Sequence, residues 1–230
     1  MKAIKKMLSF IFLIILFIIV VVGYNGYIMY NEAITNTPIE EKIQSIKNEK
    51  NYTKLNDINK TFIDAIIAVE DHRFYEHKGI DLISTTSAMF TDLKQKEIVA
   101  GGSSITQQLA KNMYFSQEKK FSRKIAEVFV VSHLEEKLSK DEILELYVNT
   151  IYYGNGYYGI GNASRGYFDK SPNDITKNEA TILAGLPNAP SAYSLNNHKE
   201  LALERQQQVL DAMVKYDYIK KEDEPFIKEN

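Results

Sequence analysis

Ionisable side chains are concentrated in one short segment, residues 70–81, which reads EDHRFYEHKGID. The segment follows an apolar run, Phe62 to Val69, whose spacing predicts one face of a helix that ends near Glu70. A carboxylate at the C-terminal end of a helix is disfavoured by the helix dipole, so it needs a nearby cation or a functional reason. The alternative interpretation is a solvated turn.

A second segment, GGSSITQQLAKN at residues 101–112, places two glycines before a hydroxyl-capped helix start. Ser104 and Gln107 fit a capping box, and backbone N–H groups at such a start can bind an anion. Gln107, Gln108 and Lys111 would add side-chain donors on the first turns. A helix that is merely well capped is the alternative, but the uncharged polar groups beyond the cap favour a binding site.

Basic residues gather between residues 111 and 124, where five lysines and arginines accompany one acid. The segment therefore carries +4 (five minus one) in a chain whose net charge is -2. Aromatic and apolar side chains lie between the charges, a combination that suits an anionic lipid headgroup at a membrane surface. Arg123 and Glu127 are also compatible with a simple surface ion pair. The basic residues are Lys111, Lys119, Lys120, Arg123 and Lys124.

Tyrosines, asparagines and glycines dominate residues 147–168. Tyrosine rings can stack on sugars and asparagine amides can bond to hydroxyl groups, so the segment is a candidate sugar-binding wall. A tyrosine-rich core with glycine turns explains the same composition equally well.

The elements that must position these residues begin with an N-terminal membrane anchor. Lys2, Lys5 and Lys6 precede residues 7–31, which hold no charge, and Met7 to Tyr30 would form a helix about 36 Å long. The hydrocarbon core of a bilayer is about 30 Å thick, and the lysines would stay cytoplasmic, so the rest of the chain would be exported. A cleaved signal peptide is the alternative, but tyrosines near the end of the run resemble an interfacial belt and favour a retained anchor. Export argues against a nucleic-acid partner.

The remaining sequence predicts a mainly α protein. Of the 230 residues, 44% are hydrophobic and 25% charged, which is typical of a globular domain, and none is a cysteine. Disulfides and cysteine metal sites are therefore excluded. Capping boxes begin helices after Ser139 and Thr176, Leu201 to Met213 forms a last amphipathic helix, and no strand pattern stands out. We expect an N-terminal flank and anchor at 1–30, a stalk at 31–50, one domain at 51–220 and a charged, frayed tail at 221–230.

In this order the segments resemble the peptidoglycan glycosyltransferase family, glycosyltransferase family 51. The family comprises the transglycosylase domain of class A penicillin-binding proteins and the monofunctional transglycosylases. Its motif E-D-x-x-F-x-x-H-x-G-x-D is matched at residues 70–81. G-x-S-T-x-T-Q-Q-x-x-K-N is matched at 101–112, with Ser104 in place of the usual Thr. R-K-x-x-E is matched at 123–127 and K-x-x-I-L-E-x-Y-x-N at 140–149, and the resemblance runs from about Ile58 to about Met213.

The resemblance implies a lysozyme-like α-helical domain with a small membrane-dipping subdomain, which polymerises lipid II into glycan strands. Transfer would invert the anomeric centre, form β-1,4 links and release undecaprenyl diphosphate. Glu70 would be the general base, which must be ionised, and Glu127 the second acidic residue, near the leaving diphosphate. Nearby cations would neutralise charge on the leaving group. The implied substrate-binding residues are Asp71, Phe74, His77, Ser103, Thr106, Gln107, Gln108, Lys111, Asn112, Lys119, Arg123 and Lys124.

The resemblance also bears on cofactors, partners and location. No cofactor is expected to be required; a divalent cation, Mg²⁺ or Mn²⁺, is compatible with the family, with Glu127 as the candidate ligand. The expected partners are lipid II, the growing lipid-linked glycan, the membrane, and transpeptidases or other cell-wall proteins. We expect a single-pass protein of the bacterial cell membrane, with a cytoplasmic N-terminus and an extracytoplasmic catalytic domain.

Because the chain stops soon after this domain, we expect a monofunctional enzyme without a transpeptidase module. Two alternative functions are also compatible with the sequence. The first is a lysozyme-like hydrolase or lytic transglycosylase that cuts finished peptidoglycan. The second is a non-catalytic, membrane-anchored scaffold of the cell-wall machinery.

Overall fold

The computed structural model describes residues 2–83, 86, 102–115 and 121–229. Within these ranges the chain is built from helices and connecting loops, and an isolated antiparallel bridge between Tyr152 and Tyr158 is the only strand-like pairing. The prediction of a mainly α protein is confirmed. The predicted membrane-dipping subdomain falls largely on residues outside the described ranges, and so does Lys119.

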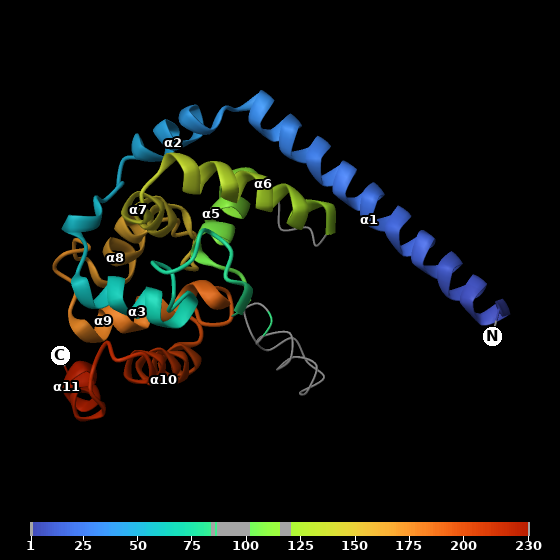
Figure 1. Ribbon diagram of the computed structural model, residues 1–230. Coiled ribbons are helices and arrows are strands. Elements are labelled where there is room, and N and C mark those ends of the chain that lie inside the picture. Colours follow the sequence, from blue (N-terminus) through green and yellow to red (C-terminus); the bar gives the residue numbers. More distant parts are fainter. Residues whose placement is uncertain (1, 84–85, 87–101, 116–120, 230) are drawn as a thin grey trace.

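The first helix, α1 (Lys2–Asn36), extends away from the rest of the molecule (Figure 1). By length and composition alone it is able to cross a membrane. Its apolar side chains from Phe10 to Val20 are exposed, because little of the protein covers them. Only its C-terminal part packs against the body, where Tyr27 and Tyr30 contact Phe129.

The junction between α1 and α6 (Phe121–Lys137) is closely packed. Gly26 lies so near Ile125 that an added Cβ would come within 2.5 Å of the Ile125 Cβ. The Tyr30 hydroxyl and His133 Nδ1 are 2.7 Å apart and share a hydrogen bond. These tyrosines therefore anchor one helix on another, in addition to any place they take at a membrane interface.

Residues 31–50 differ from the predicted stalk. The first helix continues to Asn36, and a second, α2 (Ile39–Lys47), packs against α7 (Lys140–Thr150). Ile39 and Ile46 are buried in the core. They lie seven residues apart and so share one helical face, which gives this polar-looking segment a narrow apolar stripe.

The core lies between two groups of helices. On one side, α3 (Lys60–Glu70) packs against α9 (Lys177–Gly185) and α10 (Lys199–Lys215). On the other, α5 (Ile105–Tyr114) packs against α6 and α7. The capping boxes predicted at Ser104, Ser139 and Thr176 are all present. The remaining elements are η1 (Leu55–Asp57), α8 (Ile160–Phe168), η2 (Leu186–Asn188), η3 (Lys221–Asp223) and α11 (Glu224–Glu229).

The C-terminal segment differs from the predicted frayed tail. Residues 221–229 form η3 and α11, and α11 packs on α9. Ile227 and Glu224 are buried, and Glu224 pairs with Lys221 at 2.7 Å. Hydrogen bonds to Asn178 on α9 and to Gln207 on α10 also hold this mostly charged segment against the body.

Residues 147–168 are partly core and partly surface. Tyr147 and Tyr153 are fully buried, and the Asn149 amide donates to the Thr53 carbonyl at 2.8 Å. Gly159 has φ 78° and lies against the Asn149 backbone, where a side chain would clash. The core interpretation therefore holds for Tyr147 and Tyr153, whereas Tyr158 is exposed and lines a cavity with Asn162.

Candidate active site

An open cavity of about 370 Å³ is lined by residues from several distant parts of the sequence. It lies where the end of α3, the start of α5, the first turns of α6, η2 and α10 meet. Its lining is Val69, Glu70, Ser103, Gln107, Gln108, Lys111, Arg123, Lys124, Glu127, Pro187, Asn188 and Arg205. Both acids predicted to be catalytic, and six of the residues predicted to bind substrate, therefore face one space.

Glu70 is the last residue of α3. The Gln108 side-chain amide donates to Glu70 Oε2 at 2.7 Å, while Glu70 Oε1 is buried and has no hydrogen-bond partner among the described residues. Burial raises the pKa of the Glu70 carboxyl above its ordinary value, and the hydrogen bond from Gln108 and the charge of Arg205 oppose that rise. Glu70 borders the cavity, and a desolvated carboxylate with one oxygen that lacks a hydrogen-bond partner among the described residues is suited to accept a proton.

Glu127 forms the opposite wall, two turns into α6. It is fully buried, with Arg123 Nε at 3.0 Å from one oxygen and Lys124 Nζ at 2.9 Å from the other. Lys124 also donates to the Ser103 hydroxyl at 2.9 Å. The alternative of an exposed surface ion pair is therefore excluded, because the carboxylate is inside the protein. This arrangement fixes two cationic groups at the cavity wall.

Lys111 adds a third cation to the same wall. Burial lowers the pKa of its ammonium group, as do the charges of Arg123 and Lys124, while Glu127 opposes the change. Three cations around one carboxylate leave an excess of positive charge, which is suited to a phosphate-type anion.

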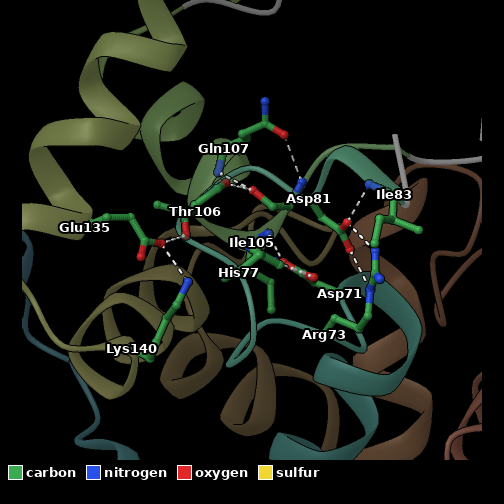
Figure 2. A network of polar contacts seen from close by, with 12 residues as sticks. Asp71, Arg73, His77, Asp81, Ile83, Ile105, Thr106, Gln107, Glu135 and Lys140 are labelled. Atoms are coloured by element: carbon green, nitrogen blue, oxygen red, sulfur yellow. Dashed lines mark hydrogen bonds and ion pairs between the residues drawn. The ribbon is translucent and has the colours of Figure 1, made fainter. Parts of the chain in front are cut away.

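Asp71 and His77 are not among the residues that line this cavity. Figure 2 shows them beside Ile105 in a network of polar contacts. The Asp71 carboxylate accepts a hydrogen bond from the Ile105 backbone N–H at 3.0 Å and lies 2.9 Å from His77 Nε2. It thereby ties the C-terminal end of α3 to the first residue of α5. Close by, Arg73 is paired with Asp81, whose carboxylate also accepts from the Ile83 N–H at 3.0 Å.

Phe74 and Thr106 also have partners within the protein. Phe74 is fully buried, with the Lys140 ammonium group 4.5 Å from its ring centre. Thr106 donates to Glu135 at 2.6 Å, and Lys140 pairs with the same carboxylate at 2.8 Å (Figure 2). The polar atoms and rings of Asp71, Phe74, His77 and Thr106 make internal contacts that join α3, α5, α6 and α7, and their contact with substrate stays a prediction.

Two further predicted residues have other surroundings. Gln107 lines the cavity, but its side-chain oxygen already accepts from the Ser104 N–H at 3.1 Å as half of the capping box. Asn112 is exposed on the other face of α5, in a separate cavity that Tyr158 and Asn162 also line. Asn112 and Lys111 therefore face different cavities, since residues one apart on a helix point in different directions. A role for Asn112 in binding substrate stays a prediction.

The cavity offers a poor fit to a resident divalent cation on Glu127. Both oxygens of that carboxylate face a cationic side chain, and the cavity's only other described carboxylate is Glu70. Metal ions prefer a cluster of unpaired oxygen ligands. We therefore derive no chemical step through a metal.

Arg205 is the functional candidate that the sequence analysis missed. It lines the cavity from α10, donates to Gln208 at 2.7 Å and lowers the pKa of Glu70. A signal was present in the sequence, because Arg205 shares a helical face with the buried residues Ala202 and Val209. A cation within an apolar stripe indicates a specific buried partner.

Comparison with known proteins defines the class. Residues 37–214 match the family model described as Transglycosylase, so the chain belongs to that family. This is the transglycosylase domain of the peptidoglycan glycosyltransferases, and the resemblance drawn from the motifs is confirmed.

Individual relatives are long penicillin-binding proteins. Penicillin-binding protein 1A of Vibrio cholerae is 46% identical over 168 residues, which cover 73% of this chain and 20% of the relative. Penicillin-binding protein 2D of Bacillus subtilis is 46% identical over 179 residues, 76% of this chain and 26% of the relative. The crystal structure of penicillin-binding protein 1A from Haemophilus influenzae is 26% identical, with a TM-score of 0.46 over 78% of this chain and 17% of its own. The chain thus spans about a quarter or less of the relatives it matches.

Proposed function

We propose that this chain polymerises lipid II, a disaccharide-pentapeptide carried on undecaprenyl diphosphate, into linear glycan strands. The observation that carries the proposal is one cavity with a buried, proton-accepting carboxylate, Glu70, on one wall and a cationic cluster around Glu127 on another. A glycosyl transfer with a diphosphate leaving group needs both features at one reacting carbon.

Each residue then has a chemical task. The oxygen of the acceptor's 4-hydroxyl attacks the anomeric carbon of the growing chain, and Glu70 Oε1 takes the proton of that hydroxyl. The bond from this carbon to the diphosphate oxygen breaks, and its electron pair leaves with undecaprenyl diphosphate. Lys111, Arg123 and Lys124 neutralise the charge that develops there. A single displacement from an α-linked donor inverts the configuration and gives a β-1,4 link.

The two alternative functions, a lytic or hydrolytic enzyme and a non-catalytic scaffold, explain fewer of the cavity's features. A hydrolase or lytic transglycosylase acts on a polymer without a diphosphate, so it has no need of three cations beside Glu127. A non-catalytic scaffold has no need of an unpaired carboxylate oxygen inside a cavity, and such a group is costly to bury.

The proposal places the site outside the cytoplasm, at the membrane surface. The support is the composition of α1, an apolar helix long enough to cross a bilayer, preceded by lysines that would remain cytoplasmic. Ser-Asp-Asn and Lys-Thr-Gly are active-site motifs of penicillin-binding proteins and β-lactamases, and the 230 residues contain neither. These residues would therefore supply glycan polymerisation and leave peptide cross-linking to transpeptidases.

The test is incubation of the purified protein with labelled lipid II in detergent, followed by gel separation with and without muramidase digestion. We expect labelled lipid II to disappear and a muramidase-sensitive polymer to form. Release of fragments from finished peptidoglycan without consumption of lipid II would identify a hydrolase or lytic enzyme instead. Lack of both activities would favour the scaffold.

A further inference from the structure

A buried tyrosine contacts the candidate base through one intermediate side chain. Tyr147, on α7, is fully buried, and its hydroxyl donates to the Gln108 side-chain oxygen at 3.3 Å. The nitrogen at the other end of the same amide donates to Glu70 Oε2 at 2.7 Å. Tyr147, Gln108 and Glu70 therefore form a chain of hydrogen bonds that runs from the core to the cavity.

The chemistry of an amide gives this chain a direction. A glutamine amide presents a donor at one end and an acceptor at the other. With its NH₂ group toward Glu70 it stabilises the ionised carboxylate, and with its oxygen toward Glu70 it stabilises the protonated acid. Burial raises the pKa of Tyr147 well above its ordinary value, so its hydroxyl keeps its proton and remains a donor. Because this hydroxyl donates to the Gln108 oxygen at 3.3 Å, it holds the amide with its NH₂ group toward Glu70.

We propose that Tyr147 is a positioning residue for the base. It fixes the Gln108 amide with its NH₂ group toward Glu70, and it thereby keeps Glu70 ionised and ready to accept a proton. This inference rests on the proposed function, because it assigns a role relative to the base of that reaction. It concerns Glu70's proton affinity, however, which can be measured without turnover.

Other charged and titratable groups also face Glu70. Lys111 on α5 and Arg205 on α10 favour the ionised carboxyl, whereas the neighbouring Asp71 disfavours it. Tyr153 is as fully buried as Tyr147 and lies in the electrostatic neighbourhood of Glu70. Its hydroxyl, however, donates to the Val148 carbonyl at 3.3 Å instead of to Gln108. Tyr153→Phe is therefore a matched control that removes a buried hydroxyl outside the chain of hydrogen bonds.

The first test is the pH dependence of kcat/KM for lipid II polymerisation. Removing a hydrogen bond that orients a partner of a charged group changes a pKa by about one unit. We expect Tyr147→Phe to move the acidic limb of the profile upward by about that amount. Activity should fall several-fold below the limb and recover at alkaline pH. Tyr153→Phe should leave the limb where it is, and Tyr147→Phe should add no further shift in a Gln108→Ala background.

The second test measures the Glu70 carboxyl directly, by ¹³C NMR titration of glutamate-labelled protein in detergent, with Glu70→Gln used to assign its signal. We expect the same upward shift in Tyr147→Phe. Should Tyr147→Phe fail to fold by circular dichroism, Gln108→Leu, which removes the NH₂ donor, must show the upward shift. An unmoved Glu70 titration, or an equal shift in Tyr153→Phe, overturns the inference. Absence of lipid II turnover in the parental protein overturns the proposed function and leaves this titration interpretable.

Discussion

At the scale of single residues, Glu70 balances two opposed influences. Its burial disfavours charge, while Gln108, Arg205 and Lys111 favour it. A general base works best when its pKa lies near the working pH. The environment of Glu70 suits a general base, because burial raises the pKa of the carboxyl while Gln108, Arg205 and Lys111 still stabilise its ionised form.

Replacement of Glu70 by glutamine tests its role as the base. Glu70→Gln keeps the shape and volume of the side chain but cannot accept a proton. Because a positioned base contributes about 10²–10⁴-fold, we expect a loss of polymerisation of that size. Circular dichroism should show an intact fold, and binding of lipid II should be retained. Polymerisation near the parental rate would remove Glu70 from the mechanism.

The raised pKa of Glu70 also predicts how stability depends on pH. The folded carboxyl holds its proton more tightly than the unfolded one, so its contribution to stability is present below the unfolded pKa and is lost as pH rises through the folded pKa. Glu70→Gln does not titrate. We therefore expect its melting temperature, relative to that of the parental protein, to increase as pH rises through this window. A difference that stays constant from acid to neutral pH would contradict the raised pKa.

Lys111 tests the cationic wall. Lys111→Ala should lower kcat by about 10–100-fold through loss of charge stabilisation at the leaving group. Lys60→Ala, which removes the same charge from a highly exposed position on α3, should have little effect. Equal losses from both variants in the gel assay would mean that positive charge acts only diffusely, for example through membrane binding.

At the scale of elements, the site depends on how α3 meets α5. The Asp71 carboxylate is the link, since it accepts the Ile105 N–H and contacts His77. Loss of this acceptor would leave a buried donor unpaired and would let Glu70 and Gln108 drift apart.

We therefore expect Asp71→Ala to lower the free energy of unfolding by about 1–3 kcal/mol and to reduce kcat as well. Asp64→Ala, on the same helix, removes an ion pair with the exposed Lys60 and should cost under about 1 kcal/mol. Chemical denaturation in detergent measures both. Similar stability of the two variants would show that Asp71 does not join the helices.

Local signals predicted most of these elements. The capping boxes at Ser104 and Thr176 marked helix starts, and the apolar spacing before Glu70 marked a helix end, because both depend on near neighbours in the chain. Partners distant in sequence could not be predicted in this way. The burial of Phe74 against Lys140 and the place of Arg205 in the same cavity as Glu70 arise only when helices far apart in sequence pack together. The motifs predicted a set of site residues without separating those that line the cavity from those that make contacts inside the protein.

At the scale of the whole molecule, α1 belongs to both the anchor and the domain. Deleting residues 1–22 removes most of the exposed apolar helix and keeps Tyr27 and Tyr30 against Phe129. We expect this variant to fold and to polymerise lipid II in detergent, with weaker membrane association. A longer deletion, of residues 1–30, should lower the melting temperature further, since it also removes the Tyr30–His133 hydrogen bond. Equal melting temperatures for the two truncations would contradict a structural role for this junction.

The continuity of α1 has a mechanical consequence. No break interrupts the helix between Lys2 and Asn36, and its last turns are fixed to α6, the helix that carries Arg123, Lys124 and Glu127. With α1 in a bilayer, a change in the tilt of α1 would rotate α6 and the cavity residues on it relative to the membrane. Membrane thickness would thus set the height of the cavity above the lipid headgroups, and vesicles of different acyl-chain length would hold the cavity at different distances from the proposed substrate, lipid II.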